Sequence, residues 1–239
     1  MTKKVAFITG ATQGIGKAIA QRLSNDGFAV AIADFNLEGA QAVAAEINET
    51  GRAIAVKVDV SDRDQVFAAV ETTVAELGGL DVVVNNAVLA QQPQSKLLHR
   101  NNLKKYMRLM SVVFTGVFKR LLKPSETLAM VVKLSMLRHK SGQVGNPELA
   151  LYGGTKFAIR GITQTAARDL ADQGITVNAY CPGIVKTPMM MDIAHKVGQN
   201  ADKDDEWGMQ QFAKDITSGP LIRTRRCGSL CCLFGWTRF

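Results

Sequence analysis

Short apolar runs alternate with longer stretches of helical periodicity in the first part of the chain. The apolar runs predict strands at residues 5–9, 28–33, 53–58 and 80–84. The segments between them predict helices at residues 17–25, 39–50 and 61–77. Ser61 is predicted to cap the third helix. Strands that are almost entirely apolar indicate a parallel sheet covered on both faces, so the predicted fold is α/β, a doubly wound parallel sheet of the Rossmann type.

The same pattern returns near residue 144. A helix is predicted at residues 149–170, with Gly174 closing it, and a buried strand at 175–180 follows. Two further helices are predicted at residues 189–196 and 207–216. Within residues 88–143, the apolar runs at 112–118 and 128–137 have no acidic caps or turn residues to delimit them, and residues 218–239 lose both periodicity and acidic residues. No element is assigned to either segment. Since no repeat or linker separates these parts, residues 1–239 are predicted to form a single domain.

The positive charge is concentrated in the two unassigned segments. Residues 88–143 hold eleven Lys and Arg and one acidic residue, and residues 218–239 hold four Arg and no acidic residue. The rest of the chain holds 14 Lys and Arg against 20 Asp and Glu, and is therefore acidic. The basic run at residues 96–108 contains one aromatic residue, Tyr106, which gives little surface for base stacking. The sequence therefore predicts no nucleic-acid partner.

Bulk features indicate a cytoplasmic protein. No apolar run reaches the roughly 20 residues that span a bilayer, so no membrane partner is expected. The chain leads from Met1 directly into the first predicted strand, unlike a cleavable signal peptide. The four cysteines are Cys181, Cys227, Cys231 and Cys232, and their spacing is neither a disulfide framework nor a zinc site with partner histidines. They are interpreted as free thiols, and no metal is predicted.

A glycine-rich turn follows the first predicted strand. Gly10, Gly14 and Gly16 connect that strand to the first predicted helix. Glycines let a phosphate approach the backbone, and the N–H groups at a helix start hold anions. Asp34 ends the second strand about 20 residues further on, where a carboxylate can accept hydrogen bonds from ribose hydroxyls. Because a carboxylate repels a 2′-phosphate, the sequence predicts NAD rather than NADP as the cofactor.

Tyr152 and Lys156 form a candidate catalytic pair. They lie four residues apart in the helix predicted at 149–170, so their side chains share one helix face. A phenol has a pKa of about 10, and a nearby ammonium group lowers that pKa toward the range of a general acid or base. The pair could pass a proton to or from a substrate oxygen.

Five motifs in this order resemble the short-chain dehydrogenase/reductase family. They are Thr9-Gly10-x-x-x-Gly14-x-Gly16, Asp59, Asn85-Asn86-Ala87, Tyr152-x-x-x-Lys156 and Pro182-Gly183-x-Val185-x-Thr187. Residues 1–87 and 144–217 are most similar to the family members that act on small diols and acyloins. The resemblance implies an NAD-dependent oxidoreductase that interconverts a small vicinal diol or acyloin and its ketone, as in the series 2,3-butanediol, acetoin and diacetyl. It also implies a homo-oligomer, usually a tetramer in the family.

The resemblance also assigns roles to individual residues. Tyr152 would donate the proton to the substrate carbonyl, and Lys156 would bind the nicotinamide ribose and lower the pKa of Tyr152. The residues implied to bind the cofactor are Gly10, Gln13, Gly14, Ile15, Gly16, Asp34, Asp59, Val60, Asn86, Ala87, Tyr152, Lys156, Pro182, Gly183, Val185 and Thr187.

The chain departs from the family at three site positions. Val88 replaces the glycine after Asn-Asn-Ala, the family's catalytic serine aligns with His139, and its helical asparagine aligns with Met110. An alternative function is therefore a dinucleotide-binding protein without turnover. Both basic segments, 88–143 and 218–239, begin abruptly beside clear family sequence, and we interpret them as translated in a shifted reading frame. An unbroken reading frame found on re-sequencing the coding DNA would contradict this interpretation.

Overall fold

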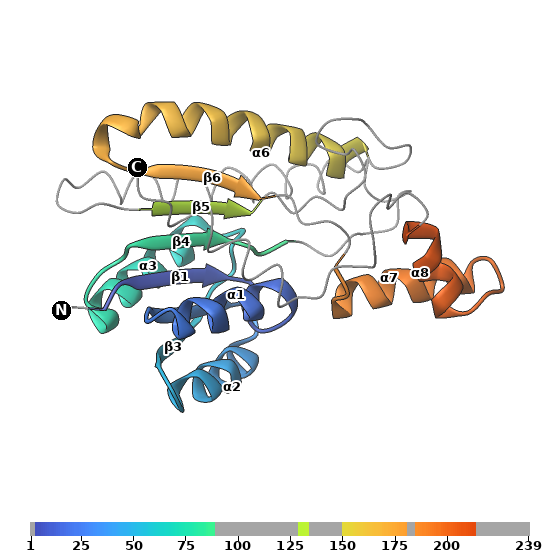
Figure 1. Ribbon diagram of the computed structural model, residues 1–239, viewed down its shortest axis with the longest axis horizontal. Coiled ribbons are helices and arrows are strands. Elements are labelled where there is room, and N and C mark those ends of the chain that lie inside the picture. Colours follow the sequence, from blue (N-terminus) through green and yellow to red (C-terminus); the bar gives the residue numbers. More distant parts are fainter. Residues whose placement is uncertain (1–2, 89–128, 134–149, 181–184, 214–239) are drawn as a thin grey trace.

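A parallel sheet forms the centre of the computed structural model, which describes residues 3–88, 129–133, 150–180 and 185–213 (Figure 1). The strands of the described residues are β1 (Val5–Thr9), β2 (Ala29–Asp34), β3 (Arg52–Lys57), β4 (Val82–Asn85), β5 (Ala129–Lys133) and β6 (Thr176–Tyr180). They lie in the order β3-β2-β1-β4-β5-β6, and every neighbouring pair is parallel. The strand order changes direction between β1 and β4, where doubly wound sheets bind their ligands. The predicted doubly wound fold is confirmed.

Helices cover both faces of this sheet. The helical elements are α1 (Gly14–Asn25), α2 (Leu37–Asn48), α3 (Arg63–Leu77), α6 (Ala150–Asp169), the 3-10 helix η1 (Ala171–Gln173), α7 (Pro188–Gln199) and α8 (Asp205–Ala213). Buried side chains of α1 and α2 share one cluster, and those of α3 and α6 share the other. Figure 1 shows α7 and α8 beyond the carboxyl ends of the strands.

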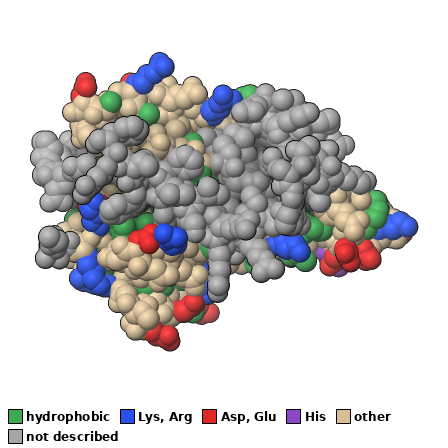
Figure 2. All heavy atoms as spheres, viewed as in Figure 1, with side chains coloured by type: hydrophobic (Ala, Val, Ile, Leu, Met, Phe, Trp, Pro, Cys, Tyr) green, Lys and Arg blue, Asp and Glu red, His purple; other side chains and the backbone are tan. Residues whose placement is uncertain are grey.

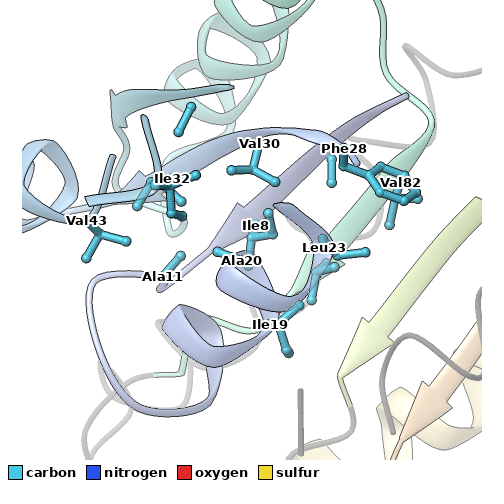
Figure 3. Packing of buried hydrophobic residues seen from close by; sticks show 14 of the residues in the cluster. Ile8, Ala11, Ile19, Ala20, Leu23, Phe28, Val30, Ile32, Val43 and Val82 are labelled. Atoms are coloured by element: carbon cyan, nitrogen blue, oxygen red, sulfur yellow. The ribbon is translucent and has the colours of Figure 1, made fainter. Parts of the chain in front are cut away.

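The strand residues alternate between these two clusters. In β1, Ala6 and Ile8 face α1, whereas Val5 and Phe7 belong to the cluster on the opposite face. Figure 3 shows Leu23 of α1 close to Ile8 at the centre of the first cluster. Both faces of β1 are thus buried, which explains why its sequence is a continuous apolar run rather than an alternating one.

Strand β5 was not predicted, and it lies inside the segment for which no element was assigned. Its backbone pairs with β4, where Asn85 is opposite Val132, and with β6, where Lys133 is opposite Tyr180. These partners are distant in sequence, so local pattern gives little information about this strand. The strand itself ends on Lys133, and neither glycine nor aspartate marks its end, unlike the ends of β1 and β2. The single-domain organisation of residues 1–239 stays a prediction.

The predicted cap of α3 was wrong by one residue. Asp62, rather than Ser61, is the N-cap, and its carboxylate accepts hydrogen bonds from the backbone N–H groups of Asp64 and Gln65. Ser61 instead donates from its N–H and hydroxyl groups to Asp59 Oδ1, at 2.8 and 2.7 Å. An ionised carboxylate is a stronger acceptor than a hydroxyl, so aspartate takes the cap when both are adjacent.

Helices α7 and α8 form a close hairpin. His195 on α7 and Asp205 on α8 approach each other at 2.7 Å between Nδ1 and Oδ1. Figure 2 shows a histidine side chain, in purple, beside acidic side chains at the right of the molecule. Gly208 of α8 lies directly against α7, because a Cβ atom there would overlap the carbonyl oxygen of Ala194. The two helices can therefore approach this closely only with glycine at position 208.

Substituting Gly208 with alanine is expected to lower the free energy of unfolding by about 1–3 kcal/mol, because the added methyl group forces the two helices apart. Thermal or urea denaturation followed by circular dichroism measures this change. Gly161→Ala on α6 is the matched control, since a Cβ atom there has no neighbour within 4 Å. This control should leave stability unchanged or raise it by up to about 1 kcal/mol through helix propensity. Equal stability of the two variants would contradict the close crossing.

Candidate active site

The predicted site residues follow the carboxyl ends of neighbouring strands. Gly10 follows β1, Asp34 ends β2, and Asn86 follows β4. Because the carboxyl ends of parallel strands meet at one edge of the sheet, these residues lie around the change in strand order between β1 and β4. This edge is the candidate site.

The glycine turn has a backbone geometry that requires glycine. Gly10 and Gly14 have positive φ angles of +64° and +57°, which side chains other than that of glycine adopt at a cost. A Cβ atom on Gly10 would lie 2.9 Å from Cα of Ala87, and one on Gly16 would overlap the carbonyl oxygen of Gly10. The turn is therefore folded tightly against the segment that follows β4.

Asn86 and Thr9 hold this turn in place through buried hydrogen bonds. Asn86 donates from Nδ2 to the carbonyl oxygens of Thr9 and Gly10, at 2.9 and 2.8 Å. Oγ1 of Thr9 accepts from the backbone N–H groups of Asn86 and Ala87, at 3.0 and 3.1 Å. Asn86 and Thr9 are 7 % and 2 % exposed, respectively. In this conformation Asn86 supports the glycine turn as a structural residue.

The first turn of α1 can receive an anion. Gln13 occupies the N-cap position with extended backbone, but its side chain makes no capping hydrogen bond, and the first turn carries no acidic residue. The N–H groups of a helix start need partners, and phosphate oxygens supply them. Ile15, the second residue of α1, is buried in the core cluster, so it would reach a phosphate only through its backbone. This donor set fits the pyrophosphate of a dinucleotide.

Asp34 lies beside the glycine turn. Its Oδ2 accepts hydrogen bonds from the N–H and hydroxyl groups of Thr12, at 3.2 and 2.9 Å, and its Oδ1 accepts from the N–H of Asn36 at 3.1 Å. The side chain is half-buried. The carboxylate is thus fixed at the end of β2, where the ribose of a bound dinucleotide would lie.

Asp59 and Val60 follow β3, the next strand outward in the sheet. Asp59 is held by Ser61, and its N–H donates to Oε1 of Gln65 at 3.0 Å. Both residues are partly exposed. They therefore lie beyond Asp34 along the same edge of the sheet.

The start of α7 closes the other end of the site. Thr187 is the N-cap of α7 and accepts a hydrogen bond from the N–H of Met190 at 3.2 Å. A Cβ atom on Gly14 would lie 3.3 Å from Cγ2 of Thr187. Val185, two residues earlier, is 5 % exposed and packs in the same core cluster as Ile15. The structure therefore brings Thr187 against the glycine turn, although they are 173 residues apart in sequence.

The candidate catalytic pair lies in the first two turns of α6. The backbone of Tyr152 belongs to this helix, and its side chain lies outside the described part of the protein. Lys156 is only 4 % exposed. The buried side of α6 also includes Thr163 and Ala166, at helical spacing from Lys156. Lys156 therefore lies on the buried side of α6, and the backbone of Tyr152 lies one helical turn before it.

Several predicted positions lie outside the described residues. These are Pro182, Gly183, and the positions His139 and Met110 that align with the family's catalytic serine and asparagine. Val88, which stands where the family has glycine, is described and is half-buried.

Two polar residues of the site were missed by sequence reasoning. Thr12 contacts Asp34, and its place within the glycine turn was the available signal. Asn85 at the end of β4 is 8 % exposed, and its Nδ2 has no hydrogen-bond partner among the described residues. Asn85 was part of the motif Asn85-Asn86-Ala87, but a cofactor-binding role was assigned only to Asn86 and Ala87.

The described residues contain neither a cluster of metal ligands nor a membrane-spanning helix. No group of three or more His, Cys, Asp or Glu side chains in the described ranges could hold a metal ion. None of the described helices is both long and apolar enough to cross a bilayer.

Comparison with known proteins matches residues 4–198 to the short chain dehydrogenase family. The chain is 45% identical over 220 residues to diacetyl reductase [(S)-acetoin forming] of Staphylococcus aureus, covering 90% of this chain and 84% of the relative. It is 36% identical over 220 residues to L-2,3-butanediol dehydrogenase of Corynebacterium glutamicum, covering 90% of this chain and 85% of that protein.

Solved structures show the same fold. The structure of 3-ketoacyl-(acyl-carrier-protein) reductase from Brucella melitensis, complexed with NADH, matches with a TM-score of 0.79 and 27% sequence identity. The match covers 98% of this chain and 91% of that chain. Other matching structures contain NADPH, so the shared fold is compatible with either nucleotide.

Proposed function

Because the chain belongs to the short-chain dehydrogenase family, we propose that it is an NAD-dependent oxidoreductase that interconverts a small vicinal diol or acyloin and its ketone. Membership of this family indicates that the chain is an oxidoreductase that acts on CH–OH groups. The names of the two relatives point to diacetyl, acetoin and 2,3-butanediol as the substrate series. The observation that carries the proposal is the 45% identity to diacetyl reductase together with an intact glycine turn and a buried Lys156.

The residues at the carboxyl edge of the sheet would hold the dinucleotide. The N–H groups of Gly14, Ile15 and Gly16 would bind the pyrophosphate, and Asp34 would accept from the adenosine ribose. Residues further along the edge would complete the site, namely Asp59 and Val60 for adenine, Asn86 and Ala87 for the ribose region, and Pro182, Gly183, Val185 and Thr187 for the nicotinamide. When bound, the nicotinamide supplies hydride transfer, and the protein supplies placement and electrostatics.

Tyr152 and Lys156 would carry the proton. In the direction of reduction, the Tyr152 hydroxyl donates its proton to the oxygen of the substrate carbonyl, and in oxidation the phenolate takes it back. The Lys156 side chain is buried one helical turn further along α6, and its positive charge would stabilise the phenolate form of Tyr152.

The proposal predicts that purified protein oxidises NADH when diacetyl or acetoin is added, and oxidises NADPH much more slowly. Absorbance at the nicotinamide band measures both rates. The substitution Asp34→Asn removes the negative charge that repels the 2′-phosphate. The rate of NADPH oxidation should therefore come closer to the rate of NADH oxidation. Binding of NADH without turnover of diacetyl, acetoin or 2,3-butanediol would instead support a binding protein without catalysis.

We propose further that the enzyme works in the cytoplasm as a homo-oligomer, tetrameric as is usual in the family. Light scattering coupled to size-exclusion chromatography measures the assembly. The intact mass of the same sample establishes whether residues 88–143 and 218–239 are present as written in the 25.9 kDa chain.

A further inference from the structure

Thr12 makes an unusual double contact with the carboxylate at the end of β2. Both its backbone N–H and its hydroxyl donate to Oδ2 of Asp34, at 3.2 and 2.9 Å. The other oxygen, Oδ1, accepts from the N–H of Asn36 at 3.1 Å. A carboxylate has about four acceptor sites on its two oxygens. Among the described residues, donors therefore fill three of these sites, and the fourth belongs to Oδ1.

The first turn of α2 holds Thr12 in this position. A Cβ atom on Gly39 would lie 3.1 Å from Cγ2 of Thr12 and 2.9 Å from Nδ2 of Asn36. Asn36 itself caps α2 by accepting from the N–H of Gly39 at 3.1 Å. The methyl group of Thr12 thus packs against a helix start that has no side chain at that point. Rotation of either Thr12 or Asp34 would break contacts on both sides.

We propose that Thr12 is a positioning residue that determines cofactor selectivity by fixing the Asp34 carboxylate toward the adenosine ribose. The proposal rests on the proposed function, in which this site binds NAD. With Oδ2 occupied, Oδ1 offers its free acceptor site to a ribose hydroxyl donor. An ionised 2′-phosphate has no hydrogen-bond donor for Oδ1 of Asp34, and its charge repels the carboxylate. NADPH could bind only if the Asp34 side chain rotated, and that rotation would break the hydrogen bonds from Thr12 and Asn36.

The same contact connects two parts of the cofactor site. Thr12 belongs to the glycine turn that would bind the pyrophosphate, and Asp34 belongs to the strand end that would bind the ribose. A displacement of one therefore moves the other. The adenosine half of the dinucleotide meets a single preorganised unit rather than two independent subsites.

The test is the ratio of dissociation constants for NADPH and NADH, measured by nicotinamide fluorescence in the wild type and in Thr12→Val. Valine keeps the shape and the backbone N–H of threonine but removes the hydroxyl donor. A hydrogen bond to a charged group corresponds to about tenfold in a binding constant. The ratio is therefore expected to fall about tenfold in Thr12→Val, and Thr12→Ser, which keeps the hydroxyl, should restore it.

Thr72→Val is the matched control, because the Thr72 hydroxyl donates to the Ala68 carbonyl on the exposed side of α3. This variant should keep the ratio of the wild type. If Thr12 has only a structural role, Thr12→Val should lower the melting temperature or reduce the affinities for NADH and NADPH by the same factor. An unchanged ratio of dissociation constants in Thr12→Val would overturn the proposal. If the wild type binds NADH but does not reduce diacetyl, the proposed reaction is contradicted. The ratio of the dissociation constants for NADPH and NADH still tests the role of Thr12 in that case. If the wild type binds neither nucleotide, both proposals are overturned.

Discussion

Replacing Tyr152 with phenylalanine is expected to lower kcat for acetoin or diacetyl reduction by about 10²–10⁴-fold, the range attributed to general acid–base catalysis. The substitution removes the hydroxyl group that would donate the proton and leaves the aromatic ring in place. The dissociation constant for NADH should stay close to that of the wild type, because in the proposed site the glycine turn and Asp34 would bind the pyrophosphate and the adenosine. Steady-state kinetics and fluorescence titration of the same preparation separate the two effects.

Tyr180→Phe is the matched control for this change. Tyr180 ends β6, is 5 % exposed and belongs to the core cluster on the α1 side. Losing its hydroxyl should affect stability, while most of kcat is retained. If Tyr152→Phe retains kcat, the proton comes from another group, and His139, at the position of the family's catalytic serine, becomes the first residue to substitute.

The first half of the sheet could be predicted from sequence because each strand is buried on both faces. The runs that became β1 and β2 are almost entirely apolar and are delimited by glycine or aspartate. Local pattern therefore carried enough information for these elements. The pattern was insufficient for β5, whose place depends on pairing with β4 and β6 rather than on its own residues.

The candidate site shows the same division between local and non-local information. The helical spacing of Tyr152 and Lys156 was visible in the sequence, and the burial of Lys156 agrees with a position facing the sheet. The approach of Thr187 to Gly14 depends on how the chain returns to the sheet edge, and it was not predicted from the sequence. The resemblance to a family only assigned both residues to the cofactor site. The hydroxyl bond from Thr12 to Asp34 depends on rotamers, which sequence spacing does not specify.

Replacing Gly16 with alanine is expected to lower kcat/KM by about a hundredfold, because a displacement of about 1 Å in a binding site has an effect of that size. The added Cβ atom would overlap the carbonyl oxygen of Gly10 and crowd Nδ2 of Asn86. Both atoms belong to the hydrogen bond at 2.8 Å that holds the turn. The turn must therefore move away from β4, and the N–H groups of the first turn of α1 move with it. The dissociation constant for NADH should rise in parallel.

The control for this effect is Gly79→Ala, at a position between α3 and β4 where a Cβ atom has no neighbour within 4 Å. It makes the same chemical change away from the site and should keep the kcat/KM and NADH affinity of the wild type. Gly16→Ala should also lower the free energy of unfolding by about 1–3 kcal/mol, as overpacking does. The informative result is the nucleotide affinity of the folded fraction. If folded Gly16→Ala binds NADH as tightly as the wild type, the glycine turn held by Asn86 has only a structural role, and the pyrophosphate binds elsewhere.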